Sequence, residues 1–167
     1  ELTTKLSIIN IKLEHGVKMP TVKAVRKIKG IKGCKILLVD DSELSLGIIG
    51  DLFRAEGFIV ETAKNGREAV DKFLSSKAGE FDGILMDVQM PEMDGLTAAR
   101  QIRSSGRYDA CAVPIIAMTG FCTETDHLRS LNAGFTCHVD KPVDVGYVCN
   151  LLDELINKNN EKDKKVC

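Results

Sequence analysis

Two stretches of the sequence decide the fold: Lys35–Ser42 reads KILLVDDS, and Ile84–Gly95 reads ILMDVQMPEMDG. Each contains a short apolar run that leads directly into acidic residues. A short apolar run without polar alternation is typical of a strand that is buried on both faces of a sheet. Both runs are therefore predicted to be interior strands of a parallel sheet, with acidic residues at their carboxyl ends.

The same alternation of apolar runs and helical stretches continues along the chain from Cys34. Apolar runs mark five expected strands: Lys35–Val39, Phe58–Ala63, Phe81–Met86, Pro114–Met118 and Thr136–Val139. Apolar residues at helical spacing mark five expected helices: Ser42–Ala55, Gly66–Phe73, Gly95–Ile102, Thr123–Ala133 and Val143–Asn157. Strands that alternate with helices are typical of βα units. The predicted fold class is α/β, a doubly wound (βα)5 domain with a five-stranded parallel sheet and helices on both faces.

Charge divides the chain into three parts. Residues 1–33 carry eight basic and two acidic side chains, for a net charge of +6, whereas residues 34–156 carry eleven basic and twenty acidic ones, for −9. The remaining residues carry +2, which gives the total of −1. An acidic body repels phosphate backbones, so this part of the chain is not expected to bind nucleic acid.

We therefore expect a basic N-terminal segment and linker over residues 1–33, one domain over residues 34–157 and a charged tail over residues 158–167. Within the N-terminal segment, Leu6–Leu13 could form a strand, because Ile9, Ile11 and Leu13 alternate with Asn10 and Lys12. The first residue is Glu1 rather than Met, which suggests a segment of a longer protein.

Composition places the chain among ordinary globular proteins, because 44% of its residues are hydrophobic and 28% are charged. Apolar runs are no longer than four residues, whereas a membrane helix needs about 20, and no signal peptide opens the chain. We expect a cytoplasmic protein, or the cytoplasmic part of a membrane-bound sensor. The six cysteines form no C-x-x-C pair, so free thiols are expected rather than a zinc site or disulfides.

Three acidic residues stand where expected strands end. Asp40 and Asp41 follow the first strand, and Asp87 follows the third. In a doubly wound sheet of order 2-1-3-4-5 these strands are neighbours, and ligands bind at the crevice outside their carboxyl ends. Three carboxylates that converge there repel one another unless a cation neutralises them, and oxygen ligands of this kind suit Mg²⁺. The sequence therefore predicts a magnesium site.

Two further polar residues fall at the same edge of the expected sheet. Thr119 ends the fourth strand, and Lys141 follows the fifth. A hydroxyl donor and an ammonium group beside a metal ion can hold a phosphoryl group. The carboxylate of Asp87 is then the natural nucleophile toward phosphorus, with Mg²⁺ and Lys141 offsetting the charge of the transferred group.

Taken together, these stretches resemble a response-regulator receiver domain of two-component signalling. The resemblance rests on KILLVDDS, on ILMDVQMPEMDG, on PIIAMTG at Pro114–Gly120 and on DKP at Asp140–Pro142. The part at Met90–Gly95 is the most specific. The resemblance implies a flavodoxin-like fold similar to the chemotaxis receiver, with strand order 2-1-3-4-5.

The resemblance also implies the role of each acidic residue. Asp87 would be the phosphoacceptor, and it would take a phosphoryl group from a phosphohistidine with self-catalysed phosphorylation and dephosphorylation. Mg²⁺ would be bound by Asp40, Asp41, Asp87 and the backbone carbonyl of Gln89. The phosphoryl donor would be the dimerisation domain of a histidine kinase or a histidine phosphotransfer protein.

The remaining site residues follow from the same resemblance. Thr119 and Lys141 would bind the phosphoryl group, and the peptide bond between Lys141 and Pro142 would be cis. Two positions depart from the family pattern. Gly120 stands where an Ala is usual, and His138 stands where a Tyr or Phe commonly acts with Thr119 as a rotating switch. His138 is either a partly exposed strand residue or a pH-sensitive switch.

These observations predict the C-terminal receiver of a hybrid histidine kinase, in which Leu6–Leu13 would be the last strand of an ATP-binding domain. A stand-alone response regulator is the alternative. A Mg²⁺-dependent phosphohydrolase with an Asp nucleophile is a further one, but such enzymes carry a second Asp two residues after the nucleophile, where this chain has Gln89. A degenerate receiver that only binds partners is disfavoured because four residues are intact: Asp41, Asp87, Thr119 and Lys141.

Overall fold

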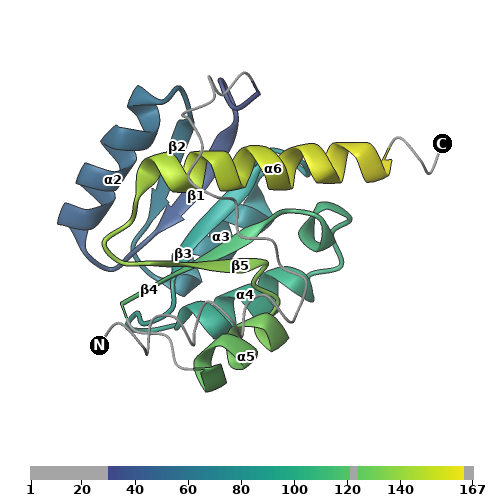
Figure 1. The fold of residues 1–167 in the computed structure, drawn as a ribbon. Helices are drawn as coiled ribbons and strands as arrows, with labels where there is room; N and C mark the ends of the chain where they lie inside the picture. The colour runs from purple at the N-terminus through teal and green to yellow at the C-terminus, as the bar shows by residue number, and fades with distance from the viewer. Residues whose placement is uncertain (1–29, 121–123, 164–167) are drawn as a thin grey trace, which may run out of the picture.

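The computed structural model describes residues 30–120 and 124–163, which form a parallel sheet with helices on both faces (Figure 1). The strands are β1 (Lys35–Val39), β2 (Ile59–Ala63), β3 (Gly83–Asp87), β4 (Ile115–Thr119) and β5 (Cys137–Asp140). The helices are α2 (Glu43–Ala55), α3 (Gly66–Ser75), α4 (Gly95–Arg103), α5 (Glu124–Ala133) and α6 (Val145–Asp163), with a short 3-10 helix η1 (Asp109–Cys111). The strand order is β2-β1-β3-β4-β5, which confirms the predicted doubly wound fold.

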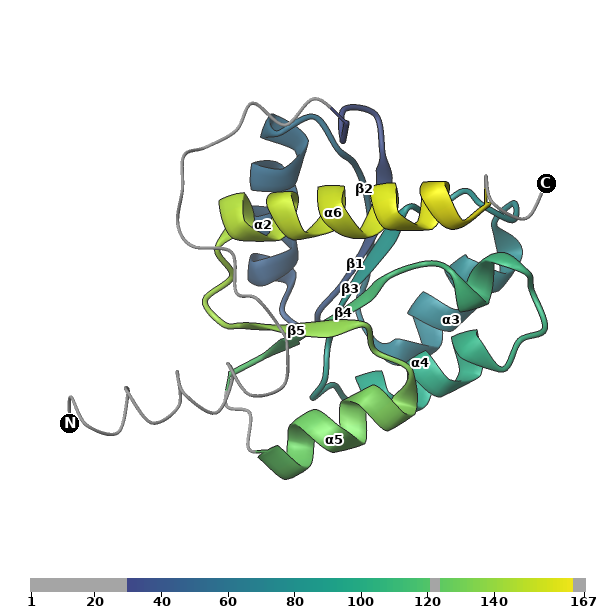
Figure 2. The same ribbon diagram turned by 45° about the vertical axis from the view of Figure 1, so that its right-hand side comes forward.

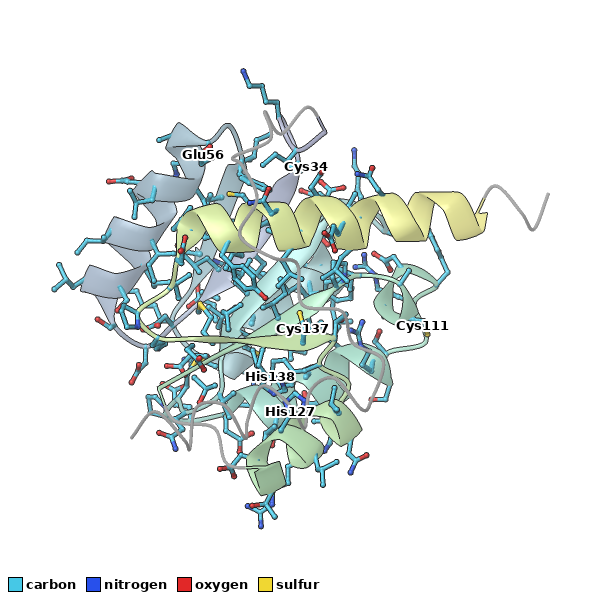
Figure 3. All side chains as sticks on the ribbon, viewed as in Figure 1. Cys34, Glu56, Cys111, His127, Cys137 and His138 are labelled. Carbon is cyan, nitrogen blue, oxygen red and sulfur yellow. The ribbon has the colours of Figure 1, made fainter. Side chains whose placement is uncertain are left out.

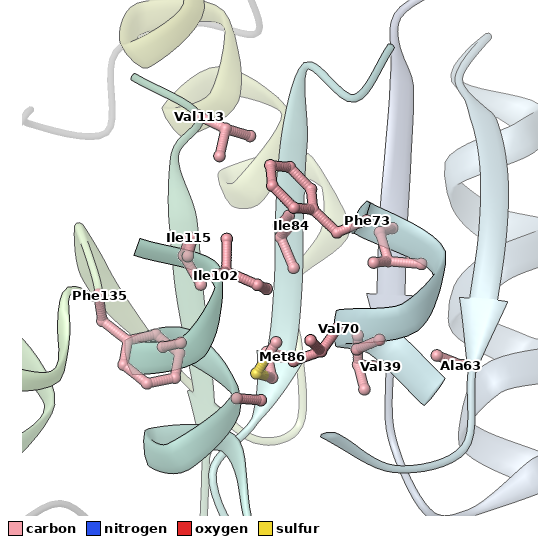
Figure 4. Packing of buried hydrophobic residues seen from close by; sticks show 14 of the residues in the cluster. Val39, Ala63, Val70, Phe73, Ile84, Met86, Ile102, Val113, Ile115 and Phe135 are labelled. Atoms are coloured by element: carbon pink, nitrogen blue, oxygen red, sulfur yellow. The ribbon is translucent and has the colours of Figure 1, made fainter. Parts of the chain in front are cut away.

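Alternate side chains of each strand point to opposite faces of the sheet, and this alternation builds two apolar clusters. In β1, Leu37 and Val39 enter one cluster, whereas Ile36 and Leu38 enter the other. Helices α3 and α4 cover the first cluster (Figure 4), and α2 and α6 cover the second. Figure 2 shows these two groups of helices on opposite sides of the sheet. Burial on both faces explains why β1, β3 and β4 are apolar along their length.

The strands are in register at their carboxyl ends. Val39 of β1 pairs with Ala63 of β2 and with Met86 of β3, and Asp87 of β3 pairs with Met118 of β4. The residues that follow each strand are therefore gathered at one edge of the sheet. This alignment makes it possible for side chains from four loops to form one site.

Four strands begin one or two residues later than the apolar runs predicted. The largest difference is at β3, which begins at Gly83 rather than at Phe81. Phe81 is buried, but it stacks on Phe73 from the loop before the strand, with ring centroids 6.4 Å apart. Burial of an apolar side chain and hydrogen-bonded pairing of its backbone within the sheet are separate properties. An apolar run in the sequence predicts only the burial. At the other end, Asp87 is the last residue of β3 rather than the first residue after it.

The last helix is longer than predicted. Helix α6 begins at Val145, after Asp144, whose side chain accepts a hydrogen bond from the amide of Tyr147. The helix continues past Asn157, the expected end, to Asp163. Residues 158–163 contain no Gly or Pro that would stop a helix, so part of the expected tail is helical.

The domain also begins earlier than residue 34. Ile31, which was expected to lie in the linker, is only 2% exposed and belongs to the cluster that contains Phe53, Phe58 and Leu152. A turn in which the amide of Cys34 donates to the carbonyl of Ile31 leads from this residue into β1. The expected strand over Leu6–Leu13 lies outside the described residues. Among the described residues, no helix has both the length and the apolar character needed to cross a membrane.

Candidate functional site

Three carboxylates meet where β1 and β3 end. Asp40 directly follows β1, and its amide donates to the carbonyl of Ala63 at the end of β2. Asp87 is the last residue of the adjacent β3. One oxygen each from Asp40, Asp41 and Asp87 lies within 4.8 Å of the others. Asp40 and Asp87 are only 1% and 7% exposed, whereas Asp41 is exposed to solvent.

Lys141 reaches this group from the end of β5. Its Nζ lies 2.7 Å from Oδ2 of Asp40 and 2.6 Å from Oδ2 of Asp87. Burial by itself lowers the pKa of Lys141, but its hydrogen bonds with Asp40 and Asp87 outweigh burial and raise that pKa above its ordinary value. The ammonium group is therefore held in the charged form between two carboxylates. The peptide bond between Lys141 and Pro142 is cis, as the resemblance implied.

The loop from β3 to α4 is tied closely to Asp87. The amide of Gln89 donates to Oδ1 of Asp87 over 3.2 Å, and the amide of Gly95 donates to the carbonyl of Val88 over 3.0 Å. A Cβ atom on Gly95 would lie 2.2 Å from the backbone oxygen of Asp87, so only glycine fits at this close approach. Asp94 caps α4 by accepting from the amide of Thr97, which fixes where the loop ends.

A second glycine, Gly66, forms a hydrogen bond with the loop from β3 to α4. This role was not identified from the sequence. The amide of Gly66, the first residue of α3, donates to the carbonyl of Met93 over 3.0 Å. A Cβ atom at Gly66 would lie 2.5 Å from that carbonyl oxygen. A glycine in the first turn of a helix, where glycine has low helix propensity, was the only signal in the sequence.

A pocket of about 520 Å³ opens beside the carboxylates. Asp41, Gln89 and Thr119 line one part of it, and Ser130 and His138 line another. Thr119 ends β4, as predicted, and its carbonyl accepts a hydrogen bond from the amide of Lys141 over 2.8 Å. The predicted site residues thus lie around this pocket and the carboxylates beside it. His138, on β5, lines the pocket but does not belong to the carboxylate group.

The donor atoms at the carboxylates are suited to a hard divalent cation. All three side chains offer oxygen, and two of the three are almost completely buried. Mg²⁺ binds few carboxylates and keeps several waters, which the exposed side of Asp41 leaves room for. Buried carboxylates that lie this close repel one another, so either Lys141 or a cation must offset their charge. The residues therefore fit Mg²⁺.

Among the described residues, the carboxylate group contains no cysteine, and Figure 3 labels three of the described cysteines: Cys34, Cys111 and Cys137. Cys34, Cys111, Cys137 and Cys149 are free thiols. Burial raises the pKa of Cys137 to about 11, so its thiol stays protonated at neutral pH. Protonated thiols are weak nucleophiles and weak metal ligands, so the Cys137 thiol is suited to neither role.

Comparison with known proteins agrees with this geometry. A family model described as "Response regulator receiver domain" matches residues 36–153. The osmosensing histidine protein kinase SLN1 of Saccharomyces cerevisiae is 33% identical over 151 residues, which is 86% of this chain and 12% of that protein. The hybrid signal transduction histidine kinase L of Dictyostelium discoideum is 32% identical over 110 residues, 65% of this chain and 6% of that protein. The chain thus spans a small part of the length of these relatives.

Solved structures give the same result. A receiver domain of a sensor histidine kinase from Pseudomonas aeruginosa, with a magnesium ion coordinated in its active site cleft, has a TM-score of 0.67 and 31% identity, covering 75% of this chain and 98% of that one. The receiver domain of Ssk1 from Saccharomyces cerevisiae, in complex with the histidine phosphotransfer protein Ypd1, has a TM-score of 0.66 and 29% identity, covering 76% of this chain and 91% of that one. The chain belongs to the response regulator receiver domain family, and its part in signalling is that of a receiver in a phosphorelay.

Proposed function

We propose that Asp87 is the phosphoacceptor of this receiver and that it takes a phosphoryl group from a phosphohistidine. The observation that supports this most directly is the placement of a nearly buried carboxylate 2.6 Å from the ammonium group of Lys141, with two further carboxylates close by. A carboxylate oxygen can attack phosphorus when nearby positive charge offsets the charge of the transferred group.

In the proposed reaction a bond forms between a carboxylate oxygen of Asp87 and phosphorus, while the bond between phosphorus and the donor imidazole breaks. The imidazole nitrogen keeps the electron pair of the broken bond. Lys141 stabilises the equatorial phosphoryl oxygens by charge, and the Thr119 hydroxyl donates to one of them. Hydrolysis of the resulting acyl phosphate regenerates Asp87. The receiver thus catalyses both its own phosphorylation and its own dephosphorylation.

Asp40, Asp41, Asp87 and the backbone carbonyl of Gln89 are the residues that would hold Mg²⁺. The bound ion would supply positive charge that offsets the phosphoryl oxygens. Lys141 forms ion pairs with both Asp40 and Asp87. If its ion pair with Asp40 breaks, the one with Asp87 remains. The exposure of Asp41 gives the ion a path from solvent.

An apolar stripe on α2 supports a helical protein as the phosphoryl donor. Leu44, Ile48 and Leu52 are 72%, 55% and 49% exposed, and their spacing of four residues places them along one face of the helix. The stripe begins three residues after Asp41, so a protein that covers it lies beside the acidic group. Exposed apolar rows of this kind mark protein interaction sites. The donor would be a histidine phosphotransfer protein or the dimerisation domain of a histidine kinase.

We further propose that the domain is part of a hybrid histidine kinase, since kinases of this class are among its relatives. A stand-alone response regulator is the alternative. A cytoplasmic location follows from the proposed chemistry, because phosphohistidine is made from ATP.

The test of the phosphoacceptor is to incubate the protein with Mg²⁺ and acetyl phosphate and to measure its intact mass. The expected result is one added phosphoryl group, which Asp87→Ala abolishes. Asp71→Ala, which removes an exposed acid on α3, is the matched control and keeps the label. Labelling that persists in Asp87→Ala would overturn the assignment. Release of phosphate with no adduct in any variant would favour the phosphohydrolase instead.

A further inference from the structure

Two histidines that the proposed chemistry does not use lie next to one another between α5 and β5 (Figure 3). The ring centroids of His127 on α5 and His138 on β5 are 4.4 Å apart, and the ring planes are tilted by 50°. Phe135 stacks on the His138 ring with centroids 6.4 Å apart. The His138 ring is half-buried and lines the same pocket as Thr119.

The tautomer of His138 follows from the hydrogen bonds of Ser130. The Ser130 hydroxyl is buried and lies 2.8 Å from the carbonyl oxygen of Asp126 and 3.0 Å from that of His127. Its single proton is therefore donated to a carbonyl of α5. The contact between Ser130 Oγ and His138 Nε2 must then be one in which Nε2–H donates and the hydroxyl oxygen accepts. In the neutral ring, Nδ1 is the nitrogen without a proton.

That second nitrogen has no place for a proton. Nδ1 of His138 is buried and has no hydrogen-bond partner among the residues that the structure describes. A proton added there would be a donor without an acceptor, next to a second imidazole. Burial first and His127 second lower the pKa of His138, and Asp140 opposes them in part.

The charged groups around the His138 ring do not offset the free-energy cost of adding a proton at Nδ1. The ladder partner of His138 on β4 is Ala117, which carries no charge. Among the described residues, the titratable and charged groups that surround His138 or line its pocket are Asp126, His127 and Arg129 on α5, Asp140 on β5, Asp94 before α4 and Asp41 after β1. The buried, unpartnered Nδ1 therefore makes the neutral imidazole the form of His138 that fits between α5 and β5.

We propose that the hydrogen bond between His138 and Ser130 is a pH-sensitive latch that holds α5 against β5, and that protonation of His138 releases it. A charged ring leaves the pocket for solvent, where both nitrogens can donate to water. Helix α5 then loses a bond to the sheet, and the wall of the pocket that contains Thr119 becomes free to move. The latch lies outside the phosphoryl chemistry and is present in the unphosphorylated protein.

The sign of the pH effect follows from the lowered pKa. Above about pH 6.5, the ordinary pKa of histidine, the ring is neutral in both the folded and unfolded chain, and the latch contributes fully. Below that pH the unfolded chain takes up the proton first, so the latched state loses stability as the pH falls. Release is complete only below the lowered pKa of His138.

The test is an NMR titration of the full, unphosphorylated chain between pH 8 and pH 5, in which histidine ring signals and the backbone amides of α5 are followed together. We expect His138 to titrate below 6.5 and the α5 amides to shift with the same midpoint. His138→Phe keeps a ring in the pocket without the titrating nitrogens, so it should abolish the α5 transition.

Two further variants separate the latch from a general effect of pH. Ser130→Ala removes the acceptor, so α5 should resemble its acidic form even at pH 8, with His138 titrating closer to 6.5. His127→Gln removes the neighbouring imidazole and should move the His138 midpoint and the α5 transition upward together. The latch is refuted if the α5 transition persists in His138→Phe, or if His138 titrates while the α5 amides stay unchanged. Asp87→Ala should leave all these shifts in place, so the result is independent of the phosphoacceptor assignment.

Discussion

At the acidic edge, some residues supply charge and another supplies space for the backbone. These two roles belong to different residues. Asp40 and Asp87 are buried carboxylates that pair with the partly buried Lys141, and either carboxylate would be costly to bury without that partner. Gly95 supplies space instead, since its missing side chain lets α4 start directly over the backbone of Asp87. The ion pairs of the acidic edge and the loop from β3 to α4 are therefore fixed by separate contacts.

A pair of glycine substitutions tests the role of space. Gly95→Ala places a Cβ atom 2.2 Å from the backbone oxygen of Asp87, so the loop must shift. We expect a loss of about 2 kcal/mol in the free energy of unfolding and much slower labelling by acetyl phosphate. The matched control is Gly47→Ala in α2, where a Cβ atom meets nothing within 4 Å. That change should stabilise the protein by about 0.5–1 kcal/mol through helix propensity. Equal effects of the two changes on urea denaturation would show that the close approach at Gly95 does not matter.

At the scale of helices and strands, α2 has two apolar faces with different roles. Leu46 and Phe53 pack into the core, whereas the stripe of Leu44, Ile48 and Leu52 faces solvent. A helix that needed only to cover the sheet would expose polar residues on its outer face. The second apolar face is therefore best explained by a partner.

Phosphotransfer with one altered residue tests that explanation. Ile48→Glu puts a charge in the middle of the stripe, and it should slow transfer from phosphorylated Ypd1, used as a heterologous donor, by at least tenfold, because burying an unpaired carboxylate at an interface costs more than about 1.4 kcal/mol. Labelling by acetyl phosphate should be unchanged, since that small donor needs no docking. The control is Leu74→Glu, which adds the same charge at an exposed apolar residue of α3. Transfer that is unaffected by Ile48→Glu, or equally affected by Leu74→Glu, would count against docking on α2.

The elements themselves were largely predictable from the sequence, and the reason is the sheet. Strands such as β1 are buried on both faces and so appear as unbroken apolar runs, and their carboxyl ends must meet, which brings Asp40, Asp87 and Lys141 together. Features that depend on packing between distant segments were not predictable. Ile31 looks like a linker residue because its partners Phe53 and Leu152 are far away in sequence. The contact of Ser130 with His138 depends in the same way on how α5 lies on β5.

At the scale of the whole molecule, cation binding at the acidic site is thermodynamically coupled to folding of the chain. The carboxylates are assembled only in the folded chain, so a cation that binds all three binds the native state and not the unfolded one. The domain that holds this site is acidic, because residues 34–156 carry a net charge of −9 although the whole chain carries only −1. A divalent cation therefore acts against local repulsion and against part of the overall charge.

Thermal unfolding with and without Mg²⁺ measures this coupling. At a metal concentration ten times the dissociation constant, mass action should stabilise the protein by about 1.4 kcal/mol. For a domain of this size that corresponds to a rise in Tm of roughly 5 °C. Asp41→Ala removes one proposed ligand without disturbing the pairing of Lys141 with Asp40 and Asp87, so it should fold normally and lose most of the rise. Asp71→Ala, which removes an exposed acid far from the ligands in sequence, should retain the full rise. If Asp41→Ala and Asp71→Ala respond alike, the cation acts by general screening of the acidic domain, and the three carboxylates are not its binding site.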